Sequence, residues 1–265
     1  MLNYQLTQED LAFWETNHYL VLRNPLPDHN VQDLKNWVTD LFSWPDTPGK
    51  WMKYYETSNL TQEQLLCRVE NFIPYHDNLR DFICSETIFS ILEQLMGEPA
   101  VLFKEKINAK LGGGSGFGAH QDAPAFITFG QKYHITMMVA VDDATTENGC
   151  MEFSDPVEVY QTLPQTPGGT IAEEVEASLP WRTLEAKAGD IVFFNSYIPH
   201  RSPANKSEKS RRAMYITYNR KSEGERRSDY FEDKRRSFPQ PCERVAGVDY
   251  SAKASLYNLG NPIAN

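Results

Sequence analysis

The sequence has few cysteines, no long hydrophobic run and fewer basic than acidic residues. Its four cysteines lie far apart and without CxxC spacing, at Cys67, Cys84, Cys150 and Cys242, which argues against a disulfide framework or a zinc knuckle. No stretch approaches the roughly 20 apolar residues of a membrane span, and the polar beginning MLNYQLTQED lacks the apolar core of a secretory signal. We therefore expect reduced thiols in a cytoplasmic protein that does not enter a membrane.

The net charge of −10 argues against general binding to nucleic acid or to anionic membranes, since both need a basic surface. A local exception runs over residues 206–236, where basic residues outnumber acidic ones. This segment is either a solvated surface of mixed charge or a rim that faces an anion. We expect a small molecule as the partner, and the sequence gives no indication of the oligomeric state.

The length of 265 residues suits one large domain with a substantial core, or at most two small ones. We expect a single domain over residues 1–265, with a helical part at 1–99, a β core at 100–220 and a C-terminal wrap at 221–265. Amphipathic spacing and stop signals predict helices at 7–14, 31–44 and 85–96, and a strand at 19–22. Short runs rich in Val, Ile, Thr, Phe and Tyr predict further strands at 100–106, 133–142, 149–153, 182–186, 190–194 and 213–219.

Helices followed by strands, without βαβ alternation, predict a mainly β fold with flanking α-helices, as in a cupin-like jelly roll. Residues 156–180 contain several Pro and Gly residues and interrupt the strands as a long insertion. Such an insertion is either a lid or an inert solvated loop.

His120, Asp122 and His200 form a candidate metal site. Two imidazoles and one carboxylate can occupy one face of an octahedral Fe(II) ion and leave the other positions open. If His120 and Asp122 lie in a strand, alternation points both to the same face, and His200 follows the apolar run DIVFFN. The glycine-rich run LGGGSGFG before this pair permits a close backbone approach, and it lacks the ending of a phosphate-binding loop. The alternative is that these are unrelated polar residues.

A dicarboxylate that chelates such a metal needs a cation for its far end, because a buried charge without a partner is costly. Arg211 and Arg212 flank the start of the strand RAMYITYN, and alternation turns only one of them inward. Ser202 can hydrogen-bond the same carboxylate. Lys104, Lys106 and Asn108 share one face of the preceding strand, which is either an exposed face or a surface for anionic ligands.

The runs KINAKLGGGSGFGAHQD, VDDATTENGCMEF and GDIVFFNSYIPHRSPANKSEKSRRAMYITYN resemble the phytanoyl-CoA dioxygenase family of 2-oxoglutarate-dependent oxygenases. The resemblance covers about residues 8–240. It implies a double-stranded β-helix that holds Fe(II) through His120, Asp122 and His200 and uses 2-oxoglutarate and O2. The later run SEGERRSDYFEDKRRSFP is similar to bacterial members that act on small zwitterions, including 2-aminoethylphosphonate hydroxylases.

The resemblance also assigns roles to the other polar residues. It implies that Arg211 and Ser202 bind the distal carboxylate of 2-oxoglutarate, that Asn108 and Lys104 contact the cosubstrate, and that Lys106 faces the substrate. Asp122 favours hydroxylation, because halogenating relatives have Gly or Ala at this position. We also expect the substrate side to be lined by Gln121, Tyr133, Phe194 and Tyr197.

One departure concerns the segment after ENGCMEF, where many relatives carry a PGSH-like run and this chain continues SDPVEVYQTLP. That difference weakens any transfer of substrate identity. Two other functions stay open, a metal-dependent cupin-like enzyme of another class, such as an isomerase or hydrolase, and a non-catalytic protein that binds 2-oxoglutarate. Activity without O2 would favour the first, and binding without turnover the second.

Overall fold

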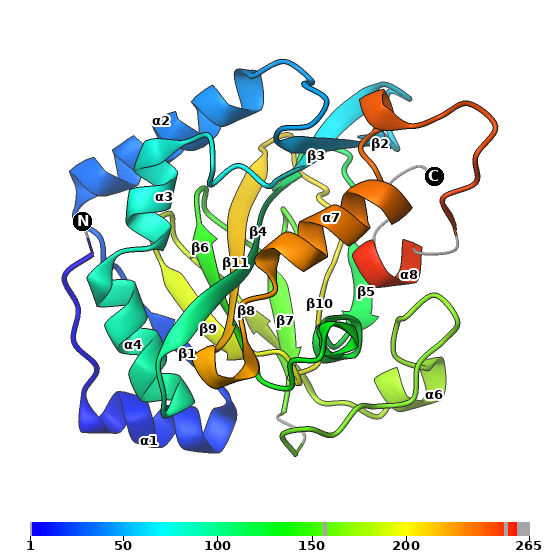
Figure 1. Cartoon of the computed structure of the whole chain (residues 1–265). Coiled ribbons are helices and arrows are strands. Elements are labelled where there is room, and N and C mark those ends of the chain that lie inside the picture. The colour runs from blue at the N-terminus through cyan, green and yellow to red at the C-terminus, as the bar shows by residue number, and fades with distance from the viewer. Residues whose placement is uncertain (1, 156–157, 252–253, 259–265) are drawn as a thin grey trace.

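A computed structural model describes residues 2–155, 158–251 and 254–258, and its strands form two antiparallel sheets (Figure 1). The larger sheet has the order β1-β9-β6-β11-β4-β3-β2, and the smaller one β5-β10-β7-β8. The strands are β1 (Tyr19–Leu22), β2 (Met52–Thr57), β3 (Gln64–Glu70), β4 (Ala100–Lys110), β5 (Phe117–His120), β6 (His134–Ala140), β7 (Met151–Ser154), β8 (Trp181–Leu184), β9 (Ile191–Asn195), β10 (His200–Ser202) and β11 (Arg211–Arg220). The helices are α1 (Gln8–Asn17), α2 (Asp28–Ser43), α3 (Asp77–Ile83), α4 (Glu86–Met96), α5 (Ala123–Phe126), α6 (Glu173–Glu176), α7 (Arg227–Ser237) and α8 (Ala254–Tyr257).

The two sheets pack against each other through a buried apolar cluster. Met138, Phe194 and Ala213 contribute to it from the larger sheet, and Met151 and Phe153 from the smaller one. Apolar side chains that alternate along each strand point between the two sheets and hold them together as a sandwich. Polar residues gather at one end of it. The expected double-stranded β-helix is confirmed, and the candidate iron ligands His120 and His200 lie on the smaller sheet.

Helices α1 to α4 gather on one side of the molecule and cover the outer face of the larger sheet (Figure 1). In α2 the apolar face buries Leu34, Val38 and Leu41 completely, as the spacing predicts. Gly97 ends α4 with a left-handed backbone, φ +76°, which glycine adopts without strain. Among the described residues, no helix is long and apolar enough to cross a membrane.

The expectation of a helical part with a single strand over residues 1–99 was wrong for β2 and β3. These strands extend the larger sheet, and β3 pairs with β4 so that Arg68 lies opposite Asn108 and Glu70 opposite Lys106. Their sequences, MKYYET and QLLCRVE, carry charged residues at buried positions, so the polar–apolar alternation of a strand is hidden. The short helices α3 and α5 and the polar helix α7 were also not predicted.

The described residues of the 156–180 insertion are attached to the smaller sheet. The Ile171 amide donates to the Ala119 carbonyl at 2.7 Å, and Ile171 is fully buried. Residues 156–157 lie outside the described part of the chain. A lid function for the insertion stays a prediction.

Candidate metal and cosubstrate site

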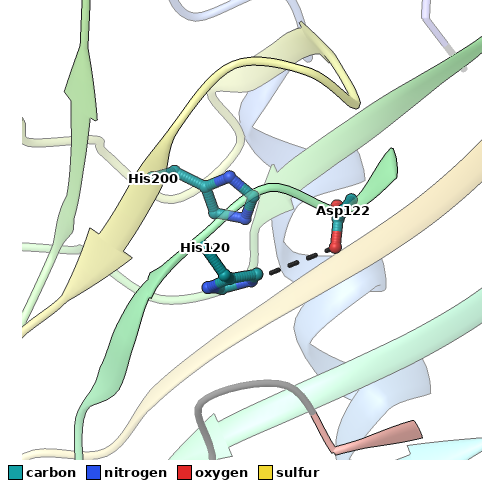
Figure 2. A group of neighbouring side chains, drawn as sticks. All are labelled: His120, Asp122 and His200. Atoms are coloured by element: carbon teal, nitrogen blue, oxygen red, sulfur yellow. Dashed lines mark ion pairs between the residues drawn. The ribbon is translucent and has the colours of Figure 1, made fainter. Parts of the chain in front are cut away.

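His120, Asp122 and His200 are brought together at one end of the smaller sheet. His120 and His200 are direct cross-strand partners in β5 and β10, and their ring centroids lie 4.2 Å apart. One ligand atom from each of the three side chains lies within 4.8 Å of the others, and all three residues are buried (Figure 2). The His120 Nε2 to Asp122 Oδ1 distance is 4.0 Å.

Strand alternation does not explain how Asp122 reaches this site, because β5 ends at His120. Asp122 stands at the start of α5, where the Ala123 amide donates to the Ser196 carbonyl at 2.9 Å. The turn into α5 therefore directs the carboxylate toward the two imidazoles. The three side chains converge as expected, but Asp122 reaches the site through the turn after the end of β5 and not through strand alternation.

Backbone carbonyls orient both imidazoles for metal binding. The Nδ1 atom of His120 lies 2.7 Å from the Gly118 carbonyl oxygen, and Nδ1 of His200 lies 3.1 Å from the Ile198 carbonyl oxygen. A carbonyl only accepts, so each Nδ1 carries the proton and donates. The Nε2 lone pairs are thereby free to bind a metal ion.

The charge states at neutral pH also suit a divalent cation. Burial, followed by the neighbouring His200, lowers the pKa of His120 to about 3, and burial lowers the pKa of His200. Burial raises the pKa of Asp122, but His200, Lys106 and Lys104 outweigh it and bring the pKa to about 2. Two neutral imidazoles beside one carboxylate fit Fe(II).

Arg211 and Arg212 point to opposite faces of β11. Arg212 binds Asp142 on the outer face, with Nε 2.8 Å and Nη2 2.9 Å from its carboxylate oxygens, and it also reaches Thr39 of α2. Arg211 is buried on the inner face, donates to the Tyr215 hydroxyl at 3.2 Å and has an Nε without a hydrogen-bond partner. A buried guanidinium with an unused donor suits a ligand carboxylate, so the geometry favours Arg211.

Lys110 is a residue of this region that the sequence analysis missed. Its Nζ lies 2.8 Å from Ser202 Oγ and 3.1 Å from the Gly149 carbonyl oxygen, and it contacts the Pro203 carbonyl oxygen. Lys110 follows Lys104, Lys106 and Asn108 at the same period of two, so alternation alone places it on this inner face. Ser202, expected to bind the cosubstrate, is therefore next to a second cation.

Lys104 and Lys106 face the metal ligands without a carboxylate partner. The ammonium of Lys104 lies 4.0 Å from the ring centroid of Phe126 and 5.3 Å from that of Tyr230. The ammonium of Lys106 lies 5.6 Å from the Tyr215 ring centroid. Among the described residues, neither ammonium has a carboxylate within ion-pair distance. Burial, followed by repulsion from Lys106, lowers the pKa of Lys104 well below its usual value.

Several predicted substrate residues have other partners. The amide of Gln121 is fully buried and bonds the Gln161 and Tyr197 carbonyls and the Leu163 amide, so it holds the insertion. Tyr133 lies in the helix-side core, and the Tyr197 hydroxyl donates to the Lys132 carbonyl. Phe194 packs edge-to-face on His200, with ring centroids 5.2 Å apart. Of these four described side chains, Phe194 is the one whose ring contacts a metal-ligand candidate, His200.

Comparison with known proteins places this geometry in a family. Residues 14–213 match the family described as Phytanoyl-CoA dioxygenase (PhyH). The chain is 56% identical to the 2-aminoethylphosphonate dioxygenase of uncultured bacterium HF130_AEPn_1, over 97% of this chain and 98% of that protein. It is 39% identical to the methylphosphonate hydroxylase of Gimesia maris, over 90% of each chain.

A solved structure of EctD from S. alaskensis with 2-oxoglutarate and 5-hydroxyectoine has the same fold. Its TM-score is 0.71 at 16% identity, over 84% of this chain and 80% of that chain. The family match covers most of the sequence, and the aminoethylphosphonate relative is more than half identical over nearly the whole chain. The chain therefore belongs to the phytanoyl-CoA dioxygenase family.

Proposed function

We propose that this enzyme, an Fe(II)- and 2-oxoglutarate-dependent dioxygenase, hydroxylates a small organophosphonate, with 2-aminoethylphosphonate as the first candidate. Two relatives named for phosphonate substrates support the substrate class. The single structural observation that supports it is the pair of ammonium groups on Lys104 and Lys106, which face the metal ligands without carboxylate partners. Cations in that state require an anionic ligand for full stabilisation.

The charges around the site support the same substrate class. The described basic residues Arg68, Lys104, Lys106, Arg211 and Lys234 outnumber the carboxylates Glu56, Glu70 and Asp122, even without Lys110, whose pKa of about 6 leaves it largely neutral at pH 7. A ferrous ion and a doubly charged 2-oxoglutarate cancel each other, so binding both leaves the excess of positive charge unchanged. A phosphonate carries more negative charge than a carboxylate or sulfonate of the same size, and it offsets more of this excess.

The residues of this chain have separable roles in the proposed reaction. His120, Asp122 and His200 would hold Fe(II), which when bound activates O2 for oxidation of a C–H bond. Arg211 would bind the distal carboxylate of 2-oxoglutarate, and Ser202 would hydrogen-bond it. Lys106 would orient the phosphonate, and Lys104, which the resemblance assigns to the cosubstrate, would add to the positive charge beside it. Phe194 would support His200 and help exclude water.

A substrate panel tests this proposal directly. The purified protein with Fe(II), 2-oxoglutarate and O2 is incubated with 2-aminoethylphosphonate, methylphosphonate and taurine, the sulfonate analogue of the first. We expect 2-aminoethylphosphonate to give succinate and, by phosphorus NMR and mass spectrometry, a product with one added oxygen. Taurine should give much less, because its sulfonate carries less charge. Succinate at background level with every phosphonate would refute the substrate class.

The matched variants separate substrate from cosubstrate recognition. Lys106→Met should raise the KM for the phosphonate and leave 2-oxoglutarate affinity nearly unchanged, whereas His120→Ala should abolish succinate formation. A cytoplasmic location stays part of the proposal, which the free cysteines support, since Cys67 and Cys150 are buried as thiols.

A further inference from the structure

A buried arginine outside the predicted site bonds one of the predicted cosubstrate residues. Arg68 of β3 is 2% exposed, and its Nε donates to Oδ1 of Asn108 at 3.0 Å. The two residues are direct cross-strand partners on the inner face of the larger sheet. Asn108 is buried as well, and β4 carries it beside Lys106, which faces the metal ligands.

This bond determines which way the Asn108 amide points. An arginine N–H can only donate, so the amide oxygen of Asn108 must face it. The Nδ2 group then points away from Arg68, and no hydrogen bond among the described residues uses it. An amide held in this way presents donors to an oxygen atom of an anionic ligand.

Arg68 is itself held by partners on its other side. Its Nη1 donates to the Tyr257 carbonyl at 3.0 Å and lies 3.5 Å from Glu70 Oε1. The second oxygen of Glu70 lies 2.5 Å from Nζ of Lys234 in α7, and all three charged side chains are almost fully buried. Figure 1 shows α7 and α8 on the right of the view, away from α1 at the lower left. A buried charge network of this kind allows the guanidinium few orientations.

We infer that Arg68 is a positioning residue that fixes the Asn108 amide as a hydrogen-bond donor to a ligand oxyanion. The inference rests on the proposed function, because that oxyanion belongs either to 2-oxoglutarate or to the phosphonate. Arg68 acts through Asn108 and does not itself touch the ligand. Lys234 and Glu70 of the same network keep the guanidinium in place.

A double-mutant cycle tests whether Arg68 acts through Asn108. The variants are Asn108→Ala, Arg68→Met and the double variant. 2-Oxoglutarate binding is measured without O2, by titrating the Fe(II) protein and following the visible absorption of the ferrous 2-oxoglutarate chelate. The KM for 2-aminoethylphosphonate is measured separately. A hydrogen bond to a charged group is worth about 1.5–3 kcal/mol, so Asn108→Ala should weaken one of the two ligands by roughly tenfold or more.

In the Arg68→Met background, Asn108→Ala should have almost no further effect, because the amide is already free to turn. Weakening confined to 2-oxoglutarate identifies the cosubstrate as the partner, and weakening confined to the phosphonate identifies the substrate. Additive effects, or no change in either ligand after Arg68→Met, would overturn the inference. An enzyme that turns over no phosphonate refutes the proposed substrate, while the anaerobic titration still decides the role of Arg68.

Two further variants distinguish positioning from stability. Arg68→Lys keeps the charge beside Glu70 but loses the Nε donor, and it replaces Arg68→Met in the cycle if that variant does not fold. Arg227→Met is the matched control, since Arg227 forms a 2.5 Å ion pair with buried Glu105 on the opposite face of the sheet. We expect Arg227→Met to lower thermal stability and to change neither affinity by more than about twofold. A loss of affinity in Arg227→Met as large as in Arg68→Met would show a general effect of unfolding and overturn the inference.

Discussion

Lys110 and Arg211 are direct cross-strand partners, so two buried basic side chains lie side by side at the end of the inner face. Burial, followed by repulsion from Arg211, lowers the pKa of Lys110 to about 6. Like charges at directly opposed positions of a sheet are destabilising. An anion bound between these strands therefore stabilises the charge of Arg211 and favours the protonated form of Lys110.

This arrangement predicts that 2-oxoglutarate binding takes up protons. In the free protein at pH 7, Lys110 is largely neutral because its pKa of about 6 lies below the pH. A bound carboxylate raises that pKa, so the complex holds up to about one more proton between pH 6 and 8. Isothermal calorimetry in buffers of different ionisation enthalpy measures the uptake.

The control for proton uptake is Lys110→Met, which fills a similar volume and cannot titrate. It should bind 2-oxoglutarate more weakly and without the buffer dependence of the binding enthalpy. Equal buffer dependence in Lys110→Met and the unmodified protein would assign the proton to another group.

The two adjacent arginines provide a matched pair of variants. Arg211→Met should weaken 2-oxoglutarate binding by about 2–5 kcal/mol, or roughly 30-fold or more, because it removes the partner of a buried carboxylate. Arg212→Met should change that affinity by less than about twofold and slightly lower the thermal stability, since Arg212 binds Asp142 on the outer face. Anaerobic titration and thermal unfolding check both variants. The reverse order of effects would identify Arg212 as the anchor.

The jelly-roll class and the convergence of His120, Asp122 and His200 were predictable, because strand periodicity and ligand chemistry are both visible in the sequence. Strands β2 and β3 were not predictable, since several of their buried positions carry charged residues, Lys53, Glu56, Arg68 and Glu70, in place of apolar ones. Arg68 and Glu70 are buried because they have partners from distant parts of the chain, the Tyr257 carbonyl and Lys234 respectively. No local pattern reveals such pairs.

The polar positions next to the metal ligands illustrate the same limit. Alternation along β4 correctly places Lys104, Lys106 and Asn108 on one face, and it extends to Lys110. Alternation cannot decide between Arg211 and Arg212, because the choice depends on Asp142 from the β6–β7 connection. Gln121 follows a metal ligand directly in sequence, yet its side-chain amide is hydrogen-bonded to backbone groups of the insertion and does not face the site.

Stability without metal should fall as the pH decreases below about 6.5. Burial lowers the pKa of His120 and of His134 to about 3, and it also lowers the pKa of His200. The unfolded chain therefore binds protons near pH 6.5 that the folded protein does not bind until lower pH, so acid favours unfolding. His120 and His134 each contribute up to about 1.4 kcal/mol per pH unit within this window. Urea unfolding of metal-free protein between pH 4 and 7 measures the slope.

His134 is a suitable control for this pH dependence because it lies outside the metal ligands. Its Nε2 lies 3.1 Å from Gln131 Oε1, and it is fully buried. His134→Gln should reduce the slope of the unfolding free energy against pH by the contribution of one histidine, and it should leave metal binding intact. A slope unchanged in His134→Gln would mean that this residue does not titrate differently in the folded and unfolded states.

The last prediction concerns the link between Gln121 and the insertion. Gln121→Ala removes an acceptor 2.7 Å from the Leu163 amide and donors to the Gln161 and Tyr197 carbonyls, so buried polar groups lose their partners. Each unsatisfied buried group costs about 1–3 kcal/mol. We expect lower stability and faster hydrogen exchange over residues 158–172. The affinity for 2-oxoglutarate should stay within about twofold, since the amide does not face Arg211.

Gln121→Glu separates the two halves of this contact. The glutamate can still accept from the Leu163 amide, but it cannot donate to the Gln161 and Tyr197 carbonyls, so exchange should rise less than in Gln121→Ala. If the insertion acts as a lid, both variants also raise the KM for the phosphonate in proportion to the exchange rate. Hydrogen exchange at Leu163 as slow in Gln121→Ala as in the unmodified protein would show that other contacts, such as the Ile171 amide on Ala119, are sufficient to hold the insertion.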